Sequence, residues 1–281
     1  MTPEHGSRRA HERGTFVFDE ERRRRSRDGP RLLVTNDDGI DAPGLQLLAR
    51  RLAARYEVVV VAPKDDCSGS GTGIGRVDAA RGVGFTTAEV PGVEEAYAIA
   101  GPPGLAVMAA TLGAFGGAPD LVVSGVNAGL NTGHSVIHSG TVGAALTART
   151  FGGRGVAISL ARSNPWHWEA AVAVACDVVE WMLRHREPSV LNVNVPALTL
   201  ERIRGAKWAR LDAFGYFRVA TSESGKNLEF DVRSKDSGRD ADSDTGYCFA
   251  GFVTLTPLST VEPEDPPNVS ARDVVPVLDF D

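Results

Sequence analysis

The chain has 281 residues, of which 42% are apolar, and it carries a formal net charge of -6 at pH 7. This length supports one large core, or one core with an appendage, and the acidic balance argues against a general nucleic-acid binder. No apolar stretch could cross a bilayer, since even the region 170–179 is interrupted by Asp177. Three scattered cysteines predict neither a disulfide framework nor a zinc site, so we expect a soluble, cytoplasmic protein.

The first thirty residues differ in composition from the rest. They are rich in arginine, glutamate and histidine and include an arginine run at 22–25. They lack the continuous apolar core of a secretory signal, so residues 1–30 are predicted to form a flexible extension. An arginine run can contact nucleic acid or an acidic partner, but the acidic remainder of the chain favours a solvated tail.

From residue 31 to about 200, apolar runs alternate with amphipathic segments. This order predicts a mostly parallel sheet with right-handed crossovers and helices on both faces, a Rossmann-like three-layer α/β/α sandwich. The strands are expected at 31–35, 57–62, 121–124, 155–160 and 190–195. The helices are expected at 43–55, 103–115, 142–151 and 166–185.

After Pro196 the pattern loses its helices. Short strands at 207–211, 216–219 and 251–255 predict a β-rich appendage over 201–260. The polar segment 222–244 is interpreted as a loop, either mobile over a site or passive on the surface. Residues 261–281 are predicted to be an extended tail, packed on a neighbour or free.

Polar residues follow three of the predicted strands. Asp37 and Asp38 precede Gly39 where an apolar run breaks, Ser68 follows the second strand, and Asn127 lies beyond the run 121–124. Taken alone, Asn-Asp-Asp-Gly is better explained as an ordinary turn. Related chemistry at three strand ends instead favours a site at the carboxyl edge of the sheet, where open α/β folds bind their ligands.

With these motifs the chain resembles the SurE survival-protein nucleotidases, which are metal-dependent phosphatases of nucleoside monophosphates. The resemblance covers roughly residues 31–258 and rests on five ordered motifs. These are Thr-Asn-Asp-Asp-Gly at 35–39 with Ala-Pro-Gly at 42–44, Val-Ala-Pro at 61–63 with Ser-Gly at 68–69, Val-Ser-Gly-Val-Asn-Ala-Gly at 123–129, Ser-Gly-Thr-Val-Gly-Ala-Ala at 139–145, and Asn-Val-Asn-Val-Pro at 192–196.

The resemblance implies one divalent cation per subunit, Mg²⁺ or Mn²⁺, for which Ca²⁺ can substitute in crystals. It implies metal ligands at Asp37, Asp38, Ser68 and Asn127, and phosphate contacts at Asn131, Ser139, Gly140 and Thr141. A metal-activated water would attack the phosphorus of a small phosphorylated substrate, oriented by Asp37 or Asp38. The appendage would swap between subunits to build a homodimer or homotetramer, with neither nucleic acid nor membrane as a partner.

The residue types agree with these expectations. Carboxylate, hydroxyl and amide oxygens are hard ligands that suit Mg²⁺ or Mn²⁺. Ser139 to Thr141 precede a helix-like stretch, and the amides at such a helix start attract phosphate. The alternative for Ser139 is an ordinary helix cap.

The chain departs from the family pattern around the expected reaction centre. An acidic pair and a tyrosine are replaced by His134, Ser135 and His138. The stretch Gly-Pro-Pro-Gly-Leu at 101–105 replaces a Gly-Thr-Pro and Asp-Cys pattern, Cys67 replaces an arginine, and Thr147 replaces a glutamate. We interpret this as altered substrate preference. His138 or His134 can serve as proton donor to the leaving group, with a solvated loop residue as an equal alternative.

Two rival enzyme classes fail on spacing. The glycines at 69, 71, 73 and 75 never form the dinucleotide-binding pattern, and no serine has the flanking glycines of a hydrolase elbow. A phosphomonoesterase is therefore the expected function. A catalytically weak or inactive nucleotide- or metal-binding protein stays open as the alternative.

Overall fold

In this computed structural model the described residues are 29–77, 82–213, 217–224, 227–234 and 240–260, with side chains described outside 214–239. The predicted tail 261–281 and all but the last two residues of the predicted extension lie outside them. Within the described residues, no helix combines the length and apolar character needed to span a membrane.

A nine-stranded sheet forms the centre of the molecule, in the order β3-β4-β2-β1-β5-β6-β7-β11-β8. The six strands in the middle of this order, β4, β2, β1, β5, β6 and β7, run parallel to one another, whereas β3 pairs antiparallel with β4. The five predicted strands are present, and the sheet adds two short strands, β3 and β4, that the sequence pattern did not indicate. The bounds are β1 (Arg31–Thr35), β2 (Glu57–Pro63), β3 (Phe85–Thr87), β4 (Glu95–Ile99), β5 (Leu121–Ala128), β6 (Gly155–Leu160) and β7 (Val190–Val195).

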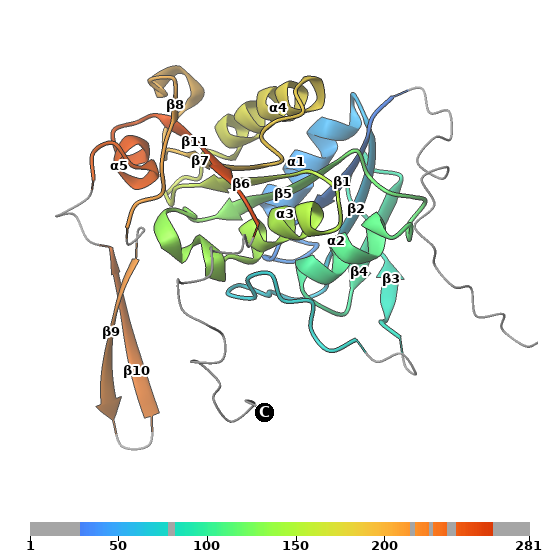
Figure 1. Cartoon of the computed structure of the whole chain (residues 1–281), viewed down its shortest axis with the longest axis horizontal. Helices are drawn as coiled ribbons and strands as arrows, with labels where there is room; N and C mark the ends of the chain where they lie inside the picture. Colours follow the sequence, from blue (N-terminus) through green and yellow to red (C-terminus); the bar gives the residue numbers. More distant parts are fainter. Residues whose placement is uncertain (1–28, 78–81, 214–216, 225–226, 235–239, 261–281) are drawn as a thin grey trace, which may run out of the picture.

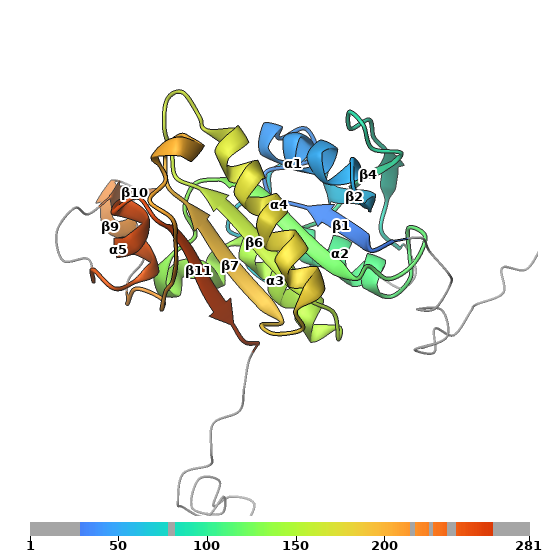
Figure 2. The ribbon, with the colours of Figure 1, turned by 90° about the horizontal axis from the view of Figure 1, so that it is seen from above.

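Helices cover both faces of the sheet (Figure 2). α1 (Pro43–Ala53) and α4 (Trp168–Arg184) lie on one face, and α2 (Pro103–Thr111) and α3 (Gly140–Thr150) lie on the other. Successive residues of β1 show the two cores, since Leu32 packs towards α1 and α4 whereas Leu33 packs towards α2. The predicted three-layer α/β/α sandwich is confirmed.

The C-terminal region contributes to the main sheet and to a separate hairpin. β11 (Val253–Leu258) pairs antiparallel with β7, and β8 (Ala206–Trp208) pairs parallel with β11. β9 (Phe217–Ser224) and β10 (Asn227–Ser234) form an antiparallel two-stranded sheet that projects from the body (Figure 1).

Two predictions for this region are wrong. Helical segments do follow Pro196, namely η3 (Leu200–Arg202) and α5 (Asp244–Phe249), which are too short to show helical periodicity. The segment 222–244 is not simply a loop, because it contains the end of β9 and all of β10. Backbone pairing in a hairpin does not require the apolar alternation by which a half-buried strand is recognised in a sequence.

Candidate active site

Three neighbouring parallel strands end at the same edge of the sheet, and each is followed by polar residues. β1 lies between β2 and β5, so Asp37 and Ser68, which follow β1 and β2, converge with Asn127 near the end of β5. Gly39 has a φ of +100°, as expected where the chain must leave the extended conformation after the two aspartates. The Cys67 amide donates to the Asp37 carbonyl at 2.8 Å, which fixes the second loop against the first.

Asp37 lies against the start of α3 and is only 3% exposed. The Thr141 hydroxyl donates to its Oδ1 at 2.5 Å. A Cβ built on Gly140 would lie 2.7 Å from Asp37 Oδ2 and 2.6 Å from Ser70 Oγ, so only glycine allows this approach. Burial raises the pKa of Asp37, and hydrogen bonds from the Thr141 hydroxyl and from backbone groups of Thr141 and Gly140 partly oppose this shift. The helix start therefore faces the carboxylate.

Asp38 is partly buried beside Asp37. Its Oδ2 accepts a long hydrogen bond, 3.4 Å, from the Ala128 amide at the end of β5. Burial, and then the negative charge of Asp37, raise the pKa of Asp38 to about 6, whereas the charge of Arg162 acts in the opposite direction. Burial and mutual repulsion disfavour the charged form of both carboxylates, and a bound cation would stabilise that form.

The two other predicted metal ligands differ in their surroundings. Asn127 lies in β5 itself, and its Nδ2 donates to the Gly129 carbonyl at 2.8 Å, which leaves the amide oxygen available to a cation. Ser68 is exposed, and its amide donates to Asp66 Oδ1 at 2.7 Å. A hydrogen bond from the Ser68 side chain also lowers the pKa of Asp66. The Ser68 hydroxyl is thus engaged with Asp66.

Among the predicted phosphate contacts, Asn131 is held most firmly. Its amide donates to Asn194 Oδ1 at 2.8 Å, its Nδ2 donates to Ser159 Oγ at 2.9 Å, and its carbonyl accepts from Asn192 and Asn194 at 2.9 Å each. Asn192 and Asn194 are fully buried on β7. Both belong to the motif at 192–196, and two asparagines at alternate positions of a strand predict one polar face.

Ser139 has the cap role that the alternative interpretation describes, because its Oγ accepts the Val142 amide at 3.1 Å. His134 and His138 are both exposed, on η2 (Gly133–His138). Backbone contacts fix their positions: the His134 amide donates to the Asp212 carbonyl at 3.0 Å, and the His138 carbonyl accepts from Gly71 at 3.2 Å.

The structure brings two residues to this region that sequence reasoning missed. Arg162, two residues beyond β6, is exposed, and its Nε lies 3.6 Å from where a Cβ on Gly129 would be. Asp244 is fully buried and accepts the amides of Gly133 and Asp212, each at 2.9 Å, so it holds the start of η2 in place. Arg162 belongs to no motif, and Asp244 follows a serine in what looks like a simple helix cap.

Two of the family departures concern packing between elements. Thr147 is buried in α3, and its hydroxyl donates to the Gly143 carbonyl of the same helix at 2.7 Å. A Cβ on Gly104 would lie 2.8 Å from the Gly73 carbonyl, and a Cβ on Gly143 would lie 1.9 Å from the Gly71 carbonyl. These glycines let α2 and α3 pack closely against the loop that carries Ser68.

The donor atoms are oxygens and carry few formal charges, so this set fits a hard cation. Within the part of the chain that the structure describes, no three His, Cys, Asp or Glu side chains gather as a metal cluster. A cation at Asp37 and Asp38 would need amide, hydroxyl or water oxygens to complete its shell, as is usual for Mg²⁺.

Comparison with known proteins agrees with this geometry. Residues 32–217 match the family model of the survival protein SurE. The chain is 35% identical over 243 residues to a 5′-nucleotidase SurE of Legionella pneumophila (strain Corby), covering 81% of this chain and 90% of that protein. A crystal structure of the SurE protein from Aquifex aeolicus superposes with a TM-score of 0.71 at 27% identity, covering 89% of this chain and 98% of the other. The chain belongs to the SurE survival-protein family.

Proposed function

We propose that this protein is a divalent-metal-dependent phosphomonoesterase that releases phosphate from a nucleoside monophosphate or a related small phosphorylated metabolite. The observation that carries the proposal is the pair of adjacent carboxylates at the carboxyl edge of the sheet, of which Asp37 is buried against the start of α3 and Asp38 is partly buried beside it. The family relationship, and a relative named as a 5′-nucleotidase, support the reaction class.

Asp37, Asp38 and the amide oxygen of Asn127 would hold Mg²⁺ or Mn²⁺, and Ser68 would join them by turning its hydroxyl away from Asp66. When bound, such an ion supplies positive charge that polarises a phosphoryl oxygen and makes water a better nucleophile. The raised pKa values of Asp37 and Asp38 suit this role, since the ion replaces the protons that burial favours.

The remaining residues would bind the phosphate and move protons. Asn131 offers a rigid amide, and Ser139, Gly140 and Thr141 offer the start of α3. The guanidinium of Arg162 adds the fixed positive charge that the motifs themselves lack. Asp37 or Asp38 would accept the proton of the attacking water. His138 is proposed to donate a proton to the leaving alkoxide, and His134 is the second candidate for this role.

One observation favours the non-catalytic alternative. The hydroxyl of Thr141 and the backbone around Gly140 already bond to Asp37, and Ser139 caps its own helix, so several predicted phosphate ligands are occupied within the protein. Phosphate release over many turnovers per site with Mn²⁺ would support the enzyme. Saturable, metal-dependent nucleotide binding without turnover would support the binding protein.

We also propose that the protein forms a homodimer or homotetramer through β9 and β10. An isolated two-stranded hairpin is marginally stable, and both its outer edges offer unpaired backbone groups. Light scattering on the wild type and on a variant with residues 217–234 replaced by a short linker tests this. The proposal fails if the wild type and the variant contain the same number of subunits.

A further inference from the structure

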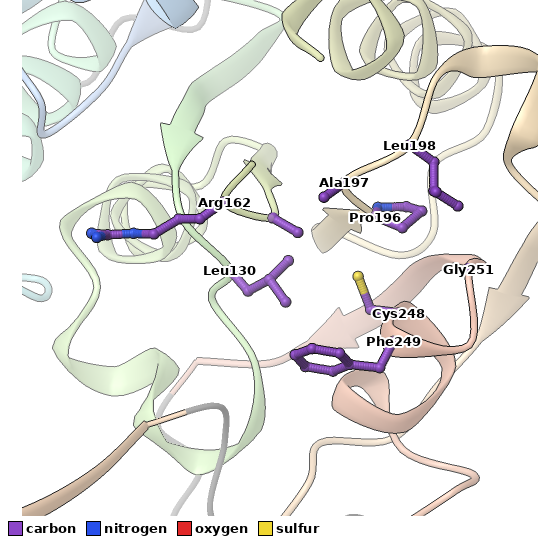
Figure 3. Close-up of a pocket in the computed structure, with 9 residues that line it drawn as sticks. Leu130, Arg162, Pro196, Ala197, Leu198, Cys248, Phe249 and Gly251 are labelled. Atoms are coloured by element: carbon purple, nitrogen blue, oxygen red, sulfur yellow. The ribbon is translucent and has the colours of Figure 1, made fainter. Parts of the chain in front are cut away.

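The edge strand β3 offers a binding surface apart from the candidate active site. The cavity in Figure 3 adjoins that site, at the carboxyl ends of β5 to β7. β3 lies beyond β4 and β2, at the end of the strand order (Figure 1). Among the described residues it pairs with β4 alone, and all three of its residues are exposed. An edge strand of this kind can accept a further strand.

Two backbone hydrogen bonds show which way the residues of β3 point. The Ala88 amide donates to the Ala96 carbonyl, and the Ala100 amide donates to the Gly84 carbonyl, each at 2.9 Å. Residues of an antiparallel strand direct their backbone groups to alternate sides, so Phe85 directs its amide and carbonyl away from β4. These two groups are thus placed to pair with an added strand.

Phe85 also forms an aromatic patch with Tyr97 of β4 and Phe115, which follows α2. The ring centroids lie 5.8 Å apart for Phe85 and Tyr97, 5.2 Å for Phe85 and Phe115, and 4.8 Å for Tyr97 and Phe115. Tyr97 and Phe115 pack against the core on the α2 face of the sheet, whereas Phe85 is 56% exposed. Apolar side chains that covered this patch would remove its exposed area from water.

Arg31 connects the start of the described chain to the aromatic patch. Its side chain is buried, and its guanidinium donates to the Phe115 carbonyl and to the carboxylates of Glu57 and Glu95. The chain that precedes β1 therefore leaves the body within the length of one arginine side chain of Phe115.

Negative charge surrounds this exit. Carboxylates gather at the amino ends of β1, β2, β4 and β5, and they outnumber the positive charges of Arg31 and of Arg50, which contacts the loop before β4 at Gly92. The carboxylates are those of Glu57, Glu94, Glu95 and Asp120. Glu57 and Glu95 pair with Arg31, yet their side chains stay 43% and 46% exposed. A basic segment would be attracted to this surface.

The segment before residue 29 lies outside the described residues, and its sequence matches this surface in the same order. Counting back from β1, five arginines come first, at 22–25 and 27, and the run Phe-Val-Phe follows at 16–18. The arginines outnumber the three acidic residues at 19–21. Phe16 and Phe18 would lie on one face of an extended strand. The eleven residues 18–28 can span about 36 Å, so these rings can reach the aromatic patch.

We propose that residues 15–25 bind the β3 edge of the same molecule. Their backbone would pair with β3, Phe16 and Phe18 would cover the aromatic patch, and the arginines at 22–25 would contact the carboxylates at the strand starts. Bound in this way, the segment would close the open edge of the sheet to pairing with other molecules.

Trypsin cleaves after arginine, so the full-length protein reports the state of the run at 22–25 directly. We expect Phe85→Ser, which leaves the cleaved sequence unchanged, to speed cleavage in this run about tenfold. The double variant Phe16→Ser/Phe18→Ser should do the same, and it decides the matter if Phe85→Ser lowers the Tm. Leu200→Ser, at a half-exposed leucine of η3, is the matched control and should be cleaved like the wild type. Equal cleavage rates in the wild type and the double variant would overturn the proposal.

Photocrosslinking shows where the segment binds and in which molecule. A p-benzoylphenylalanine in place of Phe18 should crosslink to residues 85–87 or 95–97, with the product at the mass of one chain on a denaturing gel. Crosslinks to β3 at the mass of two chains would overturn the assignment to the same molecule and indicate a second copy as the occupant. Crosslinks to other surfaces alone, or none, would overturn the assignment to the β3 edge.

Discussion

Gly140 gives the sharpest test of how α3 meets Asp37. In Gly140→Ala the new Cβ would lie 2.7 Å from Asp37 Oδ2 and 2.6 Å from Ser70 Oγ, whereas ordinary contact begins at 3.4 Å. Asp37 must therefore retreat by about 0.7 Å, and a misplacement near 1 Å costs on the order of 100-fold in rate. Overpacking costs about 1–3 kcal/mol, but alanine gains up to about 1 kcal/mol over glycine in helix propensity. We expect a net loss of at most about 2 kcal/mol in the free energy of unfolding.

The assay for this variant combines phosphate release with thermal unfolding. Gly140→Ala should lose roughly 100-fold in kcat/KM, with a Tm a few degrees lower. Gly84→Ala is the matched control, because a Cβ there meets nothing within 4 Å. A folded Gly140→Ala protein whose kcat/KM stays within about threefold of the wild type would refute the reasoning.

Three further predictions concern charges around the site. Since the pKa of Asp38 is raised from 3.8 to about 6, its contribution to stability without metal is present below about pH 4 and is lost as the pH rises through about 6. In EDTA, unfolding free energy should therefore fall by about 1–2 kcal/mol over this range, after allowance for partial exposure, and an Asp38→Asn protein with the same pH slope would contradict this. Arg162→Gln should raise KM about tenfold with little change in kcat, and the KM of Arg162→Lys should lie between those of the wild type and Arg162→Gln. Unchanged KM values would rule out the phosphate contact. Asp244→Asn should lower the free energy of unfolding by about 1–3 kcal/mol. The NH₂ group of the new asparagine would face a backbone N–H group that now donates a hydrogen bond to the Asp244 carboxylate. A Tm equal to that of the wild type would disprove this.

Much of the fold could be predicted because buried elements leave regular patterns. β1 and β2 are largely apolar runs that are covered on both faces, and α4 repeats Ala171, Ala175, Val179 and Met182 at helical spacing on its buried face. The strands β3 and β4 were missed because they are only three and five residues long, and because all of β3, the edge strand, is exposed and therefore needs no apolar alternation.

The candidate site was predictable where a motif places its residues at strand ends. Gly39 signalled the break after β1, and the parallel order of β2, β1 and β5 brings the predicted loops together. Arg162 and Asp244 could not be found this way, because neither belongs to a motif. Only the tertiary structure brings them close to the site. The bonds of Thr141 and Ser68 to neighbouring carboxylates are likewise tertiary facts that spacing does not encode.

The measurement that tests the central claim most directly is phosphate release by the wild type and Asp37→Asn. The panel would comprise 5′- and 3′-nucleoside monophosphates, sugar phosphates and p-nitrophenyl phosphate, each with Mg²⁺, Mn²⁺ or EDTA. We predict turnover that requires metal and is lost in Asp37→Asn, whose Tm in EDTA should not fall, because the substitution removes a buried charge. Undiminished turnover in EDTA, or by folded Asp37→Asn at the wild-type rate, would contradict the account.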